Sequence, residues 1–172
     1  AATPLGRTRL SKPLLGEHQV RNTRAALATL HAAGPDYAIP KASINRALST
    51  VTVPGRFQRV HEWIFDVAHN AAGARALAET LSAQRPPPPV TIVLGVLKDK
   101  DWYGMIEELA PTADRFIITQ PLSAPADRAW DPIPAAAHAN ACHVPVSLDP
   151  DFRVAIARAQ SLPGTKVVCG SL

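Results

Sequence analysis

Cysteine is scarce in this sequence, and so are the long apolar runs of a membrane protein. Cys142 and Cys169 are the only cysteines among 172 residues. Two thiols are too few for a disulfide framework and have no metal-ligand spacing, and they suit a reducing compartment. No apolar run is long enough to span a bilayer, and no signal peptide is visible. These absences predict a cytoplasmic protein with no membrane partner.

Clustered charge of one sign is also missing. The net charge is +4, and the basic residues are scattered and form no stripe, whereas nucleic-acid-binding surfaces gather theirs on one face. We therefore expect no nucleic-acid partner; arginines and lysines on loops suit anionic small molecules better. Hydrophobic residues make up 47% of the chain, which is enough for a packed core.

Two nucleotide-binding motifs are absent. The first is the phosphate-binding loop G-x-x-x-x-G-K-[ST]. The second is a glycine-rich turn after the first strand of the α/β part, where the sequence reads DVAHN; this counts against a dinucleotide-dependent oxidoreductase. The chain opens at Ala1 without a methionine and stops at Leu172 inside a predicted strand. We therefore expect a fragment of a longer protein whose upstream part carries the phosphate-binding loop.

Strand-like and helix-like segments alternate from residue 52 onward. Apolar runs predict strands at 62–67, 90–96, 115–119, 144–147 and 166–172. Helices are predicted at 71–83, 102–109, 132–141 and 151–161, the first capped by Asn70 and the last by Asp149, with Pro150 at the first helical position. This order predicts an α/β fold with a doubly wound, mainly parallel sheet.

Residues 1–51 do not show this alternation of strands and helices. A short strand is predicted at 5–10, and helices at 20–33 and 40–48, the first of them ended by Gly34-Pro35. The segment Val51-Thr52-Val53-Pro54-Gly55 interrupts the pattern. We therefore place a domain boundary there, between residues 1–51 and 52–172.

Polar residues gather where the predicted strands end, which is where open parallel sheets bind ligands. Asp66-Val67-Ala68-His69-Asn70 follows one strand, Lys98-Asp99-Lys100-Asp101 follows the next, and Pro54-Gly55-Arg56-Phe57-Gln58 precedes the first. Taken singly, each has a structural explanation: Asn70 and Asp101 cap helices, and Arg56 forms a surface ion pair of little energetic value. Their combination and order are more informative.

The motifs run GEHQVRN, PGRFQ, DVAHNAAGARAL and GVLKDKD, and the chain closes on CGSL. In this order they resemble the folylpolyglutamate synthase branch of the Mur ligase superfamily, over about residues 13–172. The resemblance implies that residues 1–51 are the tail of a central ATPase domain and that residues 52–172 are a Rossmann-like C-terminal domain.

The resemblance also implies an activity. Such ligases use ATP to phosphorylate a carboxylate of folate, and the amine of L-glutamate attacks the acyl phosphate to form an amide. Many bacterial members also join dihydropteroate to the first glutamate. ATP and Mg²⁺ are therefore the expected cofactors, with the metal ligands upstream of this chain, and the expected state is a monomer that binds small molecules.

Three residues match positions that contact ATP in the family. Asn22 matches the asparagine that faces adenine, and an amide offers both a donor and an acceptor. Arg56 matches the arginine that reaches the phosphates, which a guanidinium fork suits. Asp66 matches the aspartate that binds ribose. His69 matches a histidine near the phosphates, where it either donates to phosphate or orders its loop.

Four further residues are expected on the substrate side. Lys98, Asp99 and Lys100 match a loop that faces the glutamate cleft, and Arg128 resembles a family arginine in the loop after the third strand. We assign catalytic roles to His69, Lys98 and Lys100. Substrate binding is assigned to Asp99 and Arg128.

Two alternatives stay open. A peptidoglycan Mur ligase uses the same acyl-phosphate chemistry on a UDP-sugar peptide, although HQ in the first motif, PGRFQ and the D-K-D loop favour the folate branch. A non-catalytic Rossmann-like binding module would fold without any affinity for nucleotide.

Overall fold

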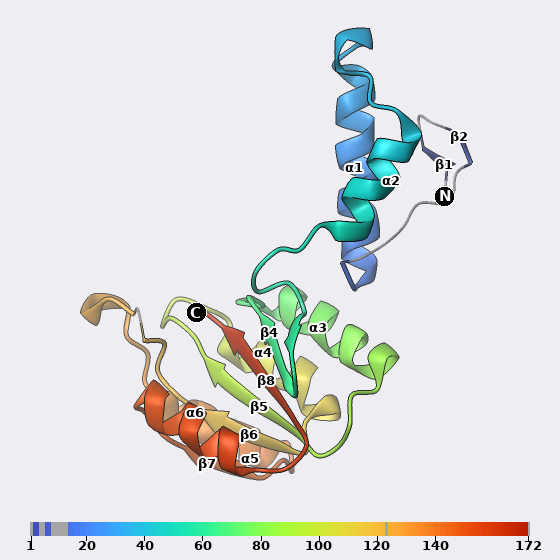
Figure 1. Ribbon diagram of the computed structural model, residues 1–172. Helices are drawn as coiled ribbons and strands as arrows, with labels where there is room; N and C mark the ends of the chain where they lie inside the picture. The colour runs from blue at the N-terminus through green and yellow to red at the C-terminus, as the bar shows by residue number, and fades with distance from the viewer. Residues whose placement is uncertain (1, 4–5, 8–13, 123, 172) are drawn as a thin grey trace. The chain divides into compact units, whose positions relative to one another are not determined.

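The computed structural model describes residues 2–3, 6–7, 14–122 and 124–171, and the chain divides into two compact units. The first unit is Ala1–Val53 and the second is Pro54–Leu172 (Figure 1). This division falls two residues after the sequence-based boundary.

The first unit is a helical hairpin with a small strand pair. Helix α1 spans Glu17–Ala32 and α2 spans Lys41–Thr50, with the 3-10 turn η1 (Pro35–Tyr37) between them. Gly34 precedes η1 with φ 98°, so the predicted helices and their glycine stop are confirmed. Strands β1 (Ala2–Thr3) and β2 (Gly6–Arg7) pair antiparallel. Most of the predicted strand 5–10 lies outside the described residues.

The second unit is built on a six-stranded sheet in the order β3-β4-β8-β5-β6-β7. Its strands are β3 (Gln58–Val60), β4 (Trp63–Asp66), β5 (Val90–Gly95), β6 (Arg115–Ile118), β7 (Val146–Leu148) and β8 (Thr165–Gly170). All neighbours pair parallel except β3 with β4. The predicted mainly parallel sheet is confirmed. The antiparallel edge strand β3 was not predicted.

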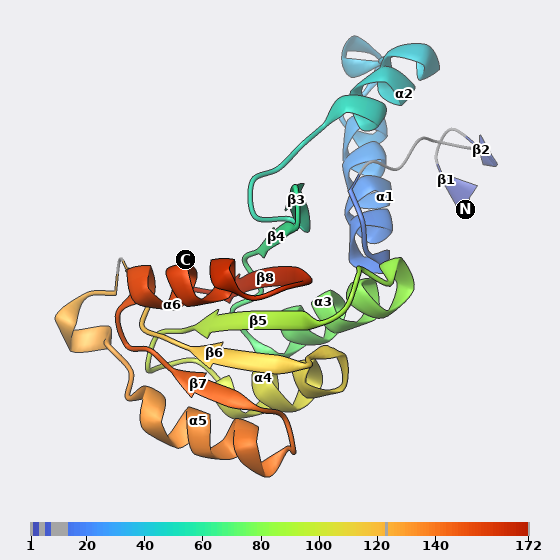
Figure 2. The same ribbon diagram turned by 60° about the horizontal axis from the view of Figure 1, so that its bottom comes forward.

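Helices cover both faces of this sheet (Figures 1 and 2). They are α3 (Ala71–Gln84), α4 (Trp102–Leu109), α5 (Pro132–Ala141) and α6 (Phe152–Ser161), with short 3-10 turns η2 (Ala110–Thr112) and η3 (Ala126–Arg128). Figure 2 shows α6 on one face and α3, α4 and α5 on the other. The doubly wound α/β prediction is therefore confirmed.

The two central strands, β5 and β8, supply the core, because all six residues of each are buried. Successive side chains of a strand point to opposite faces. On the α6 face, Val93 and Val168 pack with Ala155 and Ala159. Alanines on the helix bring its axis close to the strands. This buried sheet therefore positions the loops that follow the carboxyl ends of its strands.

The predicted N-cap of the last helix was wrong. Asp151 caps α6, with its Oδ1 accepting from the backbone N–H of Arg153 at 2.7 Å. Asp149 is nearly buried and pairs with Arg158. The carbonyl of Pro150 accepts from Gln120 N at 3.2 Å. The Asp149-Pro150 pair thus anchors the chain to β6 before the helix starts.

Candidate functional site

The PGRFQ segment forms a tight loop that leaves Arg56 exposed. Gly55 has φ 68°, and a Cβ there would lie 2.6 Å from Val67 Cγ1, so only glycine fits. Its N–H donates to Gln58 Oε1 at 3.1 Å, and its carbonyl accepts from Val67 N at 2.8 Å. Phe57 is buried in the same loop. The residues on either side of Arg56 are therefore fixed, while its side chain extends from the loop.

Asp66 joins this loop to the end of β4. Its Oδ2 accepts from Phe57 N at 2.9 Å and its Oδ1 from Ala68 N at 3.0 Å. Each carboxylate oxygen has two lone pairs and can accept more than one hydrogen bond. The predicted ligand residue is thus also a structural one. Its two hydrogen bonds hold the PGRFQ loop and the loop that follows β4.

His69 lies at the start of α3. Its Nδ1 is 2.8 Å from the carbonyl of Val67, and since a carbonyl only accepts, Nδ1 carries the proton. In the neutral ring Nε2 is then an acceptor, so a phosphate contact through Nε2 would require the imidazolium form. Asn70 caps α3 as predicted, with Oδ1 accepting from Gly73 N at 2.8 Å.

The loop after β5 is held from two sides. Where β5 and β8 end, Ser171 N donates to Gly95 O at 2.8 Å, and Ser171 Oγ accepts from Leu97 N at 3.4 Å. From the other side, Lys98 N donates to the carbonyl of Arg128 at 3.1 Å. Asp101 caps α4 by accepting from Gly104 N at 3.0 Å. These bonds determine where Lys98, Asp99 and Lys100 stand.

Asp99 and Arg128 form an ion pair across the two loops. Arg128 Nη2 donates to both carboxylate oxygens, at 2.8 and 3.0 Å, and Nε donates to Oδ1 at 3.3 Å. Lys100 Nζ is 3.4 Å from Asp99 Oδ2. Hydrogen bonding from Arg128 lowers the pKa of Asp99. Asp99 is therefore a carboxylate at neutral pH.

The fold brings these two polar groups to one edge of the sheet. Asp66 of β4 is in register with Cys169 of β8, which neighbours Leu94 of β5. Two strand spacings separate the ends of β4 and β5, roughly 10 Å. The first turns of α3 and α4 also meet, because a Cβ on Gly104 would lie 3.2 Å from Ala71 Cβ. Seven of the eight predicted site residues, all but Asn22, lie along this edge.

Asn22 lies in the first unit, on α1. Its side chain is exposed and donates to Gln19 Oε1 at 3.2 Å. Gln19 is buried and its Nε2 lies 2.9 Å from His18 Nε2. The HQ-x-x-N motif thus forms a chain of polar contacts along one helix face.

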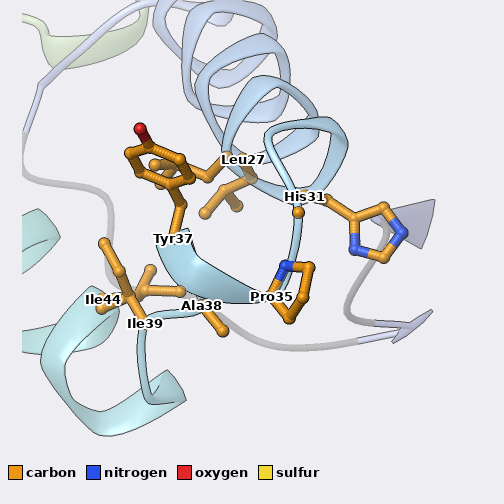
Figure 3. Close-up of a pocket in the computed structure, with 9 residues that line it drawn as sticks. Leu27, His31, Pro35, Tyr37, Ala38, Ile39 and Ile44 are labelled. Atoms are coloured by element: carbon orange, nitrogen blue, oxygen red, sulfur yellow. The ribbon is translucent and has the colours of Figure 1, made fainter.

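The structure has an apolar pocket of about 340 Å³ in each of the two units. In the first unit, a pocket between α1, η1 and α2 is lined by residues that include Leu27, Tyr37 and Ile44. Figure 3 shows the Tyr37 ring beside Leu27 and the His31 ring turned away. In the second unit, Phe65, Gly95, Pro121, Phe152 and Cys169 are among the residues around a pocket beside α6. None of the predicted site residues lines either pocket.

No metal centre is formed within the part of the chain that the structure describes, since no group of three or more His, Cys, Asp and Glu side chains could hold an ion there. Over the same residues, no helix has the length and apolar character needed to cross a membrane. Burial raises the pKa of the Cys169 thiol, and the nearby charge of Asp66 adds to this effect. Cys169 is thus a fully buried residue of the core strand β8.

Sequence reasoning missed three residues that shape the site. Gln58 closes the PGRFQ loop, Ser171 ties the end of β8 to the loop after β5, and Trp130 anchors the loop after β6 by donating from Nε1 to Thr119 O at 3.0 Å. Gln58 lies within a recognised motif, which was the available signal. The other two bond to residues 11 and 74 positions away in the sequence, which no local pattern indicates.

Comparisons with known proteins match both the sequence and the fold. The family described as "Mur ligase, glutamate ligase domain" matches residues 55–171. The Mycobacterium tuberculosis dihydrofolate synthase/folylpolyglutamate synthase is 38% identical over 113 residues, which is 62% of this chain and 23% of that protein.

Solved structures agree over most of the chain. The M. tuberculosis folylpolyglutamate synthase complexed with ADP has a TM-score of 0.80 at 32% identity, over 93% of this chain and 39% of that one. The Yersinia pestis bifunctional folylpolyglutamate synthase/dihydrofolate synthase complexed with AMPPNP and a Mn ion has a TM-score of 0.76 at 30% identity, over 96% and 38%. This chain therefore spans less than half the length of these relatives.

Proposed function

Because the chain belongs to the Mur ligase, glutamate ligase domain family, we propose that it is part of an ATP-dependent ligase that adds L-glutamate to a folate. The curated relative is a dihydrofolate synthase/folylpolyglutamate synthase, and the structural relatives carry ADP or AMPPNP. The same similarity to dihydrofolate synthase/folylpolyglutamate synthase supports dihydropteroate as a second acceptor of L-glutamate. The two units are, in this proposal, the tail of the central ATPase domain and the C-terminal domain.

The observation that carries the proposal is the Asp66 bridge between the PGRFQ loop and the start of α3. It ties the loop that carries the exposed Arg56 to a carboxylate at the carboxyl edge of the sheet. A guanidinium binds phosphate oxygens at two points and keeps its charge throughout the reaction. A carboxylate at a strand end accepts from ribose hydroxyls. Together, in this proposal, Arg56 and Asp66 fit the phosphates and the ribose of one nucleotide.

The remaining residues fit the second substrate. Phosphorylation of the folate carboxylate makes an acyl phosphate, and the glutamate amine attacks its carbonyl carbon and displaces phosphate. Lys98 and Lys100 are assigned to the carboxylates of the incoming amino acid and to the charge that develops on the departing phosphate. His69, as imidazolium, is assigned to the phosphate. In the neutral form it orders the loop through Val67.

A divalent metal supplies Lewis-acid polarisation of the phosphoryl group when it is bound, and the Y. pestis relative carries Mn with its nucleotide. The described residues of this chain form no ligand set for such an ion. We therefore expect Mg²⁺ to be held by the part of the ligase that this chain does not span, and we assign no step of this chain to it.

The test uses the ligase in which this chain occurs. We expect ADP release that requires both L-glutamate and a folate or dihydropteroate, together with a product heavier by one glutamyl residue in mass spectrometry. ADP release with a UDP-muramyl peptide in place of folate would overturn the folate assignment. A purified ligase that binds no ATP in calorimetry would overturn the assignment as an ATP-dependent enzyme.

A further inference from the structure

A thiol and an imidazole that have no part in the proposed ligase reaction lie together at the end of α5. Cys142 is the C-cap residue of this helix, and its Sγ is 3.9 Å from Nε2 of His138, one helical turn earlier. In a neutral imidazole, the ring nitrogen that carries no proton is an acceptor, and a thiol is a weak donor. With its proton on Nδ1, His138 therefore accepts from the Cys142 thiol through Nε2.

Two aromatic side chains of α4 hold the His138 ring. It stacks on Tyr103, with the ring centroids 3.7 Å apart and the planes at 20° to each other. Trp102 meets the same ring edge-on, with the centroids 6.3 Å apart. A nucleophile, a base within reach of it and a third group that orients the base form the arrangement that is typical of nucleophilic chemistry. The thiol, the imidazole and the Tyr103 ring supply these three parts.

The two cysteines of the chain differ in access to solvent. Cys169 is fully buried, and burial raises the pKa of its thiol, so we expect it to be inert. Cys142 is only half-buried, as is His138, and the Tyr103 side of the cluster is open, because this residue is 51% exposed. A reagent in solution can therefore reach the thiol of Cys142 but not that of Cys169.

A metal ion does not account for this pair. Zinc sites use three or four protein ligands, and no group of three or more His, Cys, Asp and Glu side chains could hold an ion among the residues that the structure describes. A thiol that has a base and an opening to solvent, but no further ligand, suits a reaction with a small electrophile.

We propose that Cys142 is a site of reversible thiol–disulfide exchange with small disulfides and that His138 is its base. Nε2 of His138 takes the thiol proton, and the Cys142 thiolate attacks one sulfur of the disulfide. A new S–S bond forms to that sulfur while the original S–S bond breaks. The departing sulfur keeps the electron pair of the broken bond and takes the proton from the imidazolium. Cys142 is thereby oxidised to a mixed disulfide, and the other half of the disulfide leaves as a reduced thiol.

Thiol titration of the 172-residue chain with an aromatic nitrobenzoate disulfide, which releases a coloured thiolate, would test this site. We expect one thiol to react in the folded chain and the second to react only in denaturant. Cys142→Ser should abolish the reaction of the folded chain. A folded chain in which no thiol reacts would overturn the proposal. So would a folded Cys142→Ser chain that reacts like the wild type.

Variants of His138 would test the base. His138→Phe keeps a ring beside Tyr103 but cannot take a proton, so the rate of the titration should fall about tenfold or more. His138→Gln should slow it similarly and provides a second variant if the first does not fold, which thermal melts would show. An unchanged rate in a folded His138 variant would overturn the role of this residue.

His143 provides the matched control. It is an exposed histidine directly after Cys142 in the sequence, whereas the imidazole within reach of the thiol is that of His138. Its φ is 60°, a conformation that asparagine tolerates, so His143→Asn should leave both the fold and the rate unchanged. If His143→Asn slowed the titration as much as His138→Phe does, the assignment of the base to His138 would be wrong.

Oxidised glutathione is the second probe, because it is a small disulfide without an aromatic ring. Mass spectrometry should show one adduct per folded chain, on the peptide that contains Cys142, and an excess of a reducing thiol should remove it. The absence of an adduct, or an adduct that a reducing thiol does not remove, would overturn reversible exchange with small disulfides. These measurements involve no ligase turnover, so their outcome is independent of the proposed function.

Discussion

At the scale of single residues, Asp66 combines a structural role with a proposed role in binding the ribose of ATP. It accepts from Phe57 N and Ala68 N, so Asp66→Ala should lower the free energy of unfolding by about 1–3 kcal/mol, since two backbone donors lose a charged partner. In the proposed ligase, Asp66→Ala should also raise the KM for ATP, because the proposed ribose contact would persist through the reaction. Thermal melts and steady-state kinetics with ATP varied would measure both effects. A normal melt and a normal KM together would contradict both roles.

Arg56 should behave in the opposite way. Its side chain is exposed, so Arg56→Ala should change the free energy of unfolding by less than about 0.5 kcal/mol. In the proposed phosphate contact, the charge of Arg56 would matter as negative charge redistributes on the phosphates, so kcat/KM for ATP should fall roughly 10²-fold. Arg59, an exposed arginine on β3, supplies the control, and Arg59→Ala should change neither quantity. Unchanged kcat/KM in Arg56→Ala would remove this residue from the nucleotide site.

At the scale of elements, Asp149 and Asp151 both precede α6 but have different structural roles. Asparagine caps helices about as well as aspartate, so Asp151→Asn should keep the melting temperature, whereas Asp151→Ala should cost about 1 kcal/mol. Asp149→Asn should be destabilising by about 1 kcal/mol, because the nearly buried carboxylate loses its charged bonds to Arg158. If Asp149→Asn left the melting temperature unchanged and Asp151→Asn lowered it, Asp149 and not Asp151 would be the helix cap.

The elements that the sequence predicted well are those with a local signal. Strand β5 is a continuous apolar run, and α4 begins at a capping aspartate, so both were located to within a residue. Strand β3 was missed because its three residues are all exposed and show no alternation. The Asp99–Arg128 pair joins residues 29 positions apart. Such contacts depend on strand order, which local patterns do not contain, and only the shared carboxyl edge of the sheet could be anticipated.

At the scale of the whole molecule, the two units should differ in stability. The second unit has two fully buried strands in its centre, whereas Leu27 and Ile44 are the only buried hydrophobic residues among the described residues of the first unit. A unit with few buried apolar contacts opens at low free energy. Amide exchange should therefore be faster at Leu27 and Leu30 than at Ile92 and Ile117. Equal protection at these positions would contradict separate stabilities.

The 172-residue chain by itself should show no ligase activity. Phosphoryl transfer depends on positioning and charge stabilisation by a phosphate-binding loop and a metal; the sequence contains no such loop, and the described residues hold no ligand set. The purified chain, given ATP, folate and glutamate, is expected to release no ADP. Any ADP release must be compared with the Arg56→Ala chain, since a contaminating ATPase would be indifferent to that substitution. ADP release that Arg56→Ala abolishes would contradict the prediction, because the phosphates would then be held productively by this chain alone.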